Sequence, residues 1–152
     1  GGGHVIGLVN SLHMTKLGHL GTDQLDFIRK DVAPLSSDTP IIVFSHIPLF
    51  AMYPDWGWGT DDAAQALSFL HRFSSVTCLN GHVHQLFTKT EGNVTFHTAG
   101  STAFPQPAPG KAASPGPMKD TPADRLRSVL GLSKVNYIET KSALAVIDAT
   151  LE

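Results

Sequence analysis

The sequence predicts an α/β protein in which strands and helices alternate along the first half of the chain. Three short apolar runs, at residues 4–9, 40–45 and 76–80, are rich in β-branched side chains and are typical of buried strands. Two segments with apolar residues at helical spacing separate these runs. This β-α-β-α-β order favours a parallel sheet layered with helices.

Both helices are predicted from their start signals. Thr22 is the expected N-cap of a helix over residues 23–32. The second helix is expected to start near Thr60 or Asp61.

The second half of the chain carries hairpin signals instead. Residues 86–90 and 94–98 flank the turn sequence EGN, and a final hairpin is predicted over residues 135–140 and 143–147. A Pro-rich stretch at residues 104–122 predicts a long irregular loop.

The residues after the Pro-rich stretch predict a short helix from Thr121 to about Leu130, with proline in its first turn. Neither side of the stretch forms a convincing unit alone, so residues 1–152 are interpreted as a single domain.

Composition excludes several function classes. The formal net charge of −2 gives no electrostatic footprint for a nucleic-acid polymer, so none is expected as a partner. No apolar run reaches the length of a transmembrane helix. The lone cysteine, Cys78, lies in a strand-like run and is interpreted as a buried, inert thiol.

Histidines follow two of the predicted strands. His46 comes directly after the second strand, and His82 and His84 come after the third. Ligands in α/β folds gather at the carboxyl ends of the strands. Neutral imidazole suits transition metals better than calcium or magnesium. The three histidines therefore predict a site for a divalent transition metal.

The residues around these histidines resemble a known family. Residues 45–49 (SHIPL) and 80–84 (NGHVH) are similar to the last two of the five signature blocks of the calcineurin-like metallophosphoesterases. That family includes purple acid phosphatases and cyclic-nucleotide phosphodiesterases. The likeness covers roughly residues 1–101 and implies a layered metallophosphoesterase-type α/β sandwich.

The resemblance also implies a chemistry. His46 and His82 would bind one metal and His84 a second, with manganese, zinc or iron as the ion. A hydroxide between the metals attacks phosphorus in this family. The implied function is metal-dependent, phosphodiesterase-like hydrolysis of phosphate esters, with one or two ions bound.

The chain departs from the family pattern in its first three blocks. These blocks supply a bridging aspartate and an Asn-His pair, and neither a Gly-Asp nor a Gly-Asn-His occurs in the sequence. The chain is therefore expected to be the carboxyl-terminal half of such a domain. It would pair with a missing amino-terminal half, self-associate, or hold a single metal through all three histidines with a position open for water.

Two other function classes remain open. One is a single-metal carboxylic ester hydrolase with a small ester as substrate, for which Ser45 or Ser101 is expected near the site. The other is a non-catalytic fragment that binds a metal or a partner. The sequence identifies no catalytic residue.

Further residues are candidates for contacts with substrate or for support of the site. Trp56 and Trp58 follow His46 on a loop, and they either stack on an aromatic group or cover the core. Asp55 is the candidate for a substitute metal ligand.

Two candidates belong to the strands themselves. Asn80 is expected to shape the loop that carries His82. His97 lies on the strand predicted at residues 94–98, where it either contacts phosphate or metal or is an ordinary hydrogen-bonded strand residue.

Overall fold

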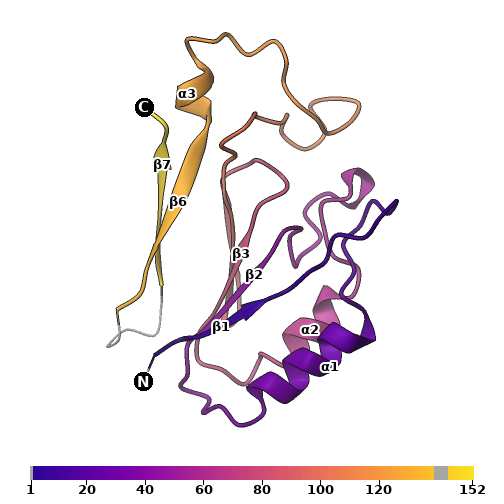
Figure 1. Ribbon diagram of the computed structural model, residues 1–152, viewed down its shortest axis with the longest axis vertical. Coiled ribbons are helices and arrows are strands. Elements are labelled where there is room, and N and C mark those ends of the chain that lie inside the picture. Colours follow the sequence, from indigo (N-terminus) through magenta and orange to yellow (C-terminus); the bar gives the residue numbers. More distant parts are fainter. Residues whose placement is uncertain (1, 139–143) are drawn as a thin grey trace.

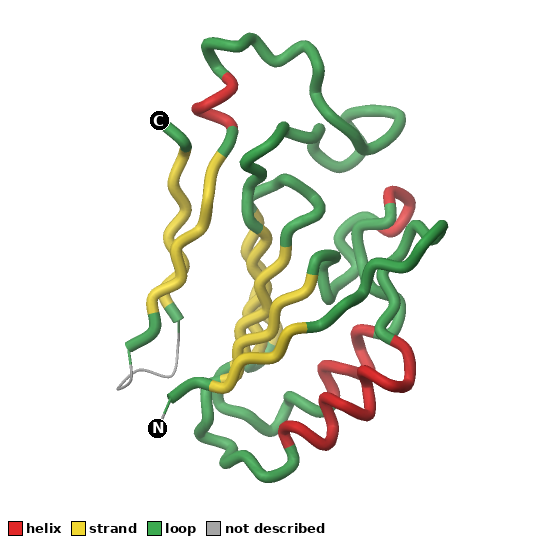
Figure 2. Tube along the Cα trace, viewed as in Figure 1, coloured by secondary structure: helices red, strands yellow, loops and turns green. Residues whose placement is uncertain are grey.

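A computed structural model describes residues 2–138 and 144–152 and shows a mixed α/β fold. A five-stranded sheet with strand order β1-β2-β3-β5-β4 forms the centre of the molecule. Helices pack on one face of this sheet, and a two-stranded ribbon lies on the other side (Figures 1 and 2). The predicted α/β class is confirmed at this level.

The parallel part of the sheet follows the predicted alternation. Strands β1 (His4–Gly7), β2 (Ile41–Ser45) and β3 (Val76–Asn80) run parallel. Ser45 of β2 lies opposite Asn80 of β3, so the two strands end at the same level. The loops that follow β2 and β3 therefore leave the sheet side by side.

The helices cover the sheet but start differently from the prediction. Helix α1 (Gly21–Val32) has no side-chain cap of its own, so the assignment of Thr22 as N-cap was wrong. The carboxylate of Asp62 instead accepts the backbone N–H groups of Leu20 (3.0 Å) and Gly21 (2.8 Å). An acceptor from a distant segment satisfies the free N–H groups of the helix as well as a local one does.

The remaining elements of this part of the chain are a short helix, a 3₁₀ turn and a hairpin. The second helix, α2 (Ala63–Ser68), is shorter than its apolar pattern suggested, and a single 3₁₀ turn, η1 (Pro54–Trp56), lies in the loop before it. Strand β4 (Phe87–Glu91) joins β5 (Val94–Thr98) in the predicted hairpin. Strand β5 also pairs in parallel with β3, which makes the sheet mixed.

The carboxyl-terminal ribbon departs from the prediction in its bounds. Strands β6 (Gly131–Asn136) and β7 (Ala145–Thr150) pair antiparallel, with β6 starting four residues earlier than expected. Residues 139–143, which include the ends of both predicted strands, lie outside the described residues. Helix α3 is confined to Leu126–Val129, whereas residues 104–122 are irregular as predicted.

The core lies between the sheet and α1 and α2. Its side chains are almost entirely excluded from solvent and include Ile6, Ile28, Val43, Leu70, Phe73 and Phe96. Cys78 belongs to this core, and burial raises the pKa of its thiol to about 12, as expected of an inert cysteine.

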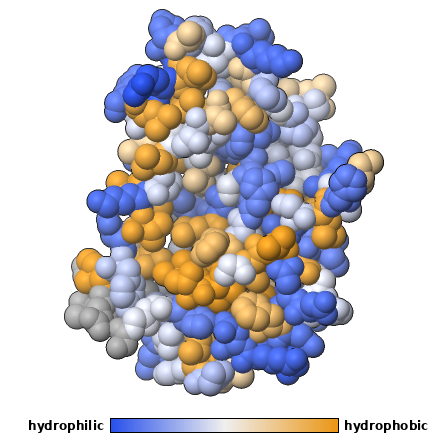
Figure 3. Space-filling view, viewed as in Figure 1, coloured by the Kyte–Doolittle hydropathy of each residue, from blue (hydrophilic) through white to orange (hydrophobic). Residues whose placement is uncertain are grey.

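Some apolar side chains stay outside this core. Val5 and Phe44 are about half exposed, and Figure 3 shows apolar surface over the β1 edge of the sheet. No helix among the described residues is both long and apolar enough to cross a lipid bilayer.

Candidate metal centre

The ends of β2 and β3 bring two of the predicted ligands together. His46 follows β2 and His82 follows β3 by two residues. Nε2 of His46 lies 3.1 Å from Nδ1 of His82, and the two rings meet edge to face. The contact is a hydrogen bond in which one ring nitrogen donates and the other accepts, and it joins two residues that are 36 positions apart in the chain.

The backbone of the His82 loop is strained. His82 and His84 have φ values of 65° and 53°, in the left-handed region that side chains other than glycine rarely adopt. Each such residue costs about 1–2 kcal/mol and persists only where its surroundings fix it. The Gly81 N–H donates to the carbonyl of His46 (3.1 Å), which ties this loop to the loop after β2.

A hydrogen bond fixes which ring nitrogen of His84 carries a proton. Its Nδ1 lies 2.8 Å from the backbone oxygen of Phe104, and a carbonyl oxygen can only accept. Nδ1 of His84 therefore carries a proton, and Nε2 is the nitrogen left to bind a metal.

The His82 ring is neutral at ordinary pH. Burial, followed by the nearby rings of His46 and His84, lowers the pKa of its imidazole to about 4, against a backbone contact with Gly57 that raises it. At neutral pH the His82 ring therefore has no positive charge to lose before it binds a cation.

Asn80 holds the two strand ends in register. Its side chain is 5% exposed, and Nδ2 donates to the backbone oxygen (3.1 Å) and to the hydroxyl (2.9 Å) of Ser45. The Ser45 hydroxyl in turn donates to the carbonyl of Ile47 (3.0 Å). Both candidates thus support the loop that carries His46, and Ser45 is engaged rather than free for nucleophilic chemistry.

Asn10 is a supporting residue that the sequence interpretation missed. Its side chain is fully buried, accepts the N–H of Ile47 (3.1 Å) and donates to the Ile47 carbonyl (2.8 Å). The same amide donates to the hydroxyl of Thr60 (2.8 Å). Because Ile47 follows His46 directly, Asn10 clamps the backbone next to a candidate ligand.

A pocket opens over the three histidines, and we call it the histidine pocket. Its volume is about 350 Å³, and it is lined by His46, Trp56, Trp58, His82, His84, Phe104, Gln106, Pro115 and Gly116. Both tryptophans contribute to its wall and meet edge to face, with their ring centroids 5.1 Å apart. Trp58 is 1% exposed, so it serves both the wall and the packing beneath it.

The Pro-rich loop closes the other side of the histidine pocket. Gln106 donates from its side chain to the carbonyl of His82 (2.9 Å), and its Oε1 accepts the N–H of Gly116 (3.2 Å). The sequence interpretation expected an irregular loop here and assigned none of its residues to the site.

Two candidates lie away from the pocket. Asp55 is exposed on η1 and does not line the pocket wall. His97 is 6% exposed, and its ring nitrogens meet the hydroxyl of Thr88 (2.7 Å) and the carboxylate of Asp148 (3.0 Å). These contacts favour the interpretation of His97 as a hydrogen-bonded strand residue that joins the sheet to β7.

The three histidines do not meet at one point. Over residues 2–138 and 144–152, one group of three His, Cys, Asp or Glu side chains has its ligand atoms within 4.8 Å of each other, and it is His19, Asp61 and Asp62. The ring nitrogens of His46, His82 and His84 are therefore not all within 4.8 Å of one another, and the arrangement with all three histidines on a single metal stays a prediction. Since the Asp62 carboxylate caps α1, the other cluster has a structural explanation.

The cluster at His19 leads to a titration prediction. The hydrogen bond to Asp61 (2.7 Å), aided by the nearby charge of Asp62, raises the pKa of His19 above its ordinary value of 6.5. In Asp61→Asn the pKa of His19 should fall back toward 6.5, as followed by NMR of the ring protons. The exposed Asp38→Asn is the control and should leave the titration of His19 unchanged. If the pKa of His19 were the same in the Asp61→Asn protein as in the unchanged protein, the pairing of His19 with Asp61 would be contradicted.

Comparison with known proteins adds no family assignment. No protein-family model matches the chain, and no curated protein matches it. The functional assignment therefore depends on the residues and the geometry described above.

Proposed function

We propose that the chain supplies part of the metal centre of a metallophosphoesterase-type hydrolase, acting on phosphate esters and above all on diesters. The observation that carries the proposal is the 3.1 Å approach of His46 Nε2 and His82 Nδ1 at the ends of two adjacent parallel strands. The fold would then be part of the layered α/β sandwich that the sequence resemblance implies.

The spacing of the two nitrogens suits one metal ion. Zinc–nitrogen bonds are about 2.0–2.1 Å long, so two tetrahedral nitrogen ligands lie about 3.3 Å apart. The observed separation of 3.1 Å is close to this value. The neutral state of His82 and the strained backbone of its loop fit the same interpretation.

His84 would serve a second position. Its Nδ1 is fixed by Phe104, so Nε2 is the nitrogen available to bind. The resemblance assigns this histidine to the other metal of a pair, which agrees with the ring nitrogens of the three histidines not all lying within 4.8 Å of one another. The carboxylate that joins the metals in the family has no counterpart in the recognised blocks of this sequence.

The residues of the chain have distinct roles in this proposal. A bound transition metal would lower the pKa of a water molecule and neutralise charge on the phosphate. His46 and His82 would hold the ion, while Asn10, Asn80 and Gly81 keep the two loops in place. Trp56 and Trp58 would present an apolar wall to the ester group.

A substrate panel tests the proposal. The protein is loaded with zinc or manganese, its metal content is measured, and it is then assayed with an aryl phosphodiester, an aryl phosphomonoester and an aryl carboxylate ester. We expect metal-dependent hydrolysis of the phosphodiester that a chelator abolishes.

The other outcomes separate the alternatives. Turnover of the carboxylate ester alone would indicate the single-metal ester hydrolase. Metal binding without turnover of any ester would indicate a non-catalytic metal-binding fragment. Hydrolysis that survives complete removal of metal would contradict the proposed function.

A further inference from the structure

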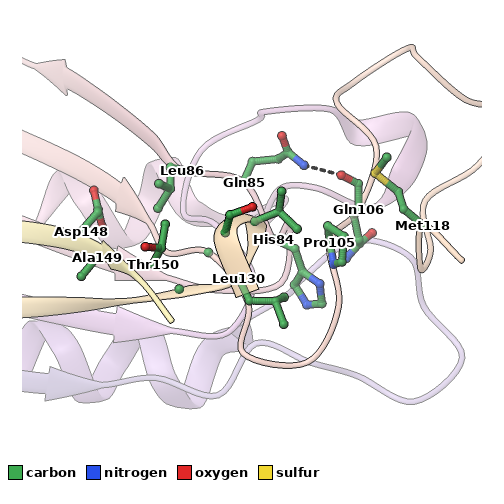
Figure 4. A pocket seen from close by; sticks show the side chains of 14 residues that line it. His84, Gln85, Leu86, Pro105, Gln106, Met118, Leu130, Asp148, Ala149 and Thr150 are labelled. Atoms are coloured by element: carbon green, nitrogen blue, oxygen red, sulfur yellow. Dashed lines mark hydrogen bonds between the residues drawn. The ribbon is translucent and has the colours of Figure 1, made fainter. Parts of the chain in front are cut away.

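A second pocket adjoins the histidine pocket, and we call it the hairpin pocket because β6 and β7 form one of its walls. Its volume is about 510 Å³, within the range of pockets that hold small organic ligands. His84 and Gln106 line both pockets, so the two cavities are neighbours that share these side chains. Figure 4 shows Asp148 and Thr150 at the end of the hairpin pocket away from His84 and Pro105.

Hydrogen bonds hold the walls of the hairpin pocket in place. The N–H of Gly131 donates to the carbonyl of Ser101 (2.9 Å), which fixes the start of β6 against the loop after β5. The side chain of Gln85 donates to the backbone oxygen of Gln106 (2.7 Å), the contact drawn as a dashed line in Figure 4. The pocket is therefore tied to both the sheet and the Pro-rich loop.

The lining combines apolar surface with one charge. Leu86, Met118 and Val129 line the pocket and are each about half exposed, so they offer apolar area that no other part of the described chain covers. Asp148 is the one acidic residue among the residues that line it, and neither lysine nor arginine is among them. An apolar pocket with a carboxylate at one end suits a cation on an apolar stem.

Asp148 keeps its negative charge. Burial would raise the pKa of its carboxyl, but hydrogen bonds from Ser133 (2.6 Å) and His97 (3.0 Å) outweigh it and hold the pKa below its ordinary value. Both bonds end on Oδ1 of Asp148. A second anionic group in this pocket would be repelled by the carboxylate.

We propose that the hairpin pocket binds an apolar organic group that carries an amine or quaternary ammonium, with the cation at Asp148. Its place in catalysis rests on the proposed function: the pocket would take the amine-bearing substituent of a phosphodiester whose phosphorus lies at the histidine pocket. Binding of the amine itself does not depend on hydrolysis.

The test measures binding without turnover. Benzyltrimethylammonium, benzyl alcohol and benzoate share an aromatic ring and differ in charge, and their binding is followed by the backbone NMR signals of Gly131 and Thr150. We expect the cation to bind about fivefold more tightly than the alcohol, because an exposed charge pair contributes up to such a factor. Benzoate should bind most weakly.

Two variants and a control localise the effect. Asp148→Asn should remove the preference for the cation. Leu86→Ala should lower the affinity for all three probes by about fivefold. Leu132→Ala, at a leucine outside the pocket that is likewise more than half exposed, should leave the binding of all three probes unchanged. Equal affinity for all three probes would overturn the proposal. So would NMR signal changes that are confined to residues outside the hairpin pocket. Cation binding in a protein that hydrolyses no phosphate ester would overturn the proposed function and leave the amine site in place.

Discussion

Replacing His82 by alanine is expected to lower the affinity of the chain for zinc or manganese by at least about 100-fold. The substitution removes one of the two nitrogens that approach to 3.1 Å, and changes in the surroundings of a metal ligand alone already cost 10–100-fold. Hydrolysis of an aryl phosphodiester should fall at least as far. Isothermal titration with the metal and a steady-state assay measure the two effects.

The control for this variant is another histidine. His71 is exposed beyond the end of α2 and lines neither the histidine pocket nor the hairpin pocket. His71→Ala should therefore keep the metal affinity and the activity of the unchanged protein. If the His82→Ala protein retained full metal affinity, the pair formed by His46 and His82 would not be the metal site.

Replacing Asn10 by alanine is expected to destabilise the fold by about 3 kcal/mol. The substitution deletes three hydrogen bonds from a fully buried side chain and leaves the N–H of Ile47 without that acceptor. Because the neighbouring residue is His46, metal affinity should fall as well. Urea unfolding gives the free energy, and titration at a temperature where the variant is folded gives the affinity.

Gln65→Ala provides the matched control for the loss of an amide. Gln65 lies exposed on α2, and surface substitutions of this kind change stability by less than about 0.5 kcal/mol. An Asn10→Ala protein that is as stable as Gln65→Ala would show that the buried network does not hold the loop.

The sequence predicted the sheet because its strands are short, apolar and bounded by turn signals. The runs that end at Ser45 and Asn80 become adjacent parallel strands of equal register, and this register brings His46 and His82 together. Period and composition are local properties, so they identify such strands without knowledge of the fold.

Features that depend on distant segments could not be predicted in the same way. Thr22 had the residue type of a helix cap, yet Asp62 of another segment provides the acceptor. Gln106 belongs to a loop with no periodic signal, and its contact with His82 depends on how that loop folds back. Asn10 gave one local signal, a polar residue soon after an apolar strand, much as Ser45 and Asn80 are the polar last residues of theirs.

A zinc- or manganese-loaded crystal, with diffraction recorded at the absorption edge of the metal, tests the central assignment most directly. We predict an anomalous peak about 2.0–2.3 Å from both Nε2 of His46 and Nδ1 of His82. A peak only at His19, Asp61 and Asp62, or no protein-bound metal at all, would contradict the assignment of the two strand-end histidines as metal ligands.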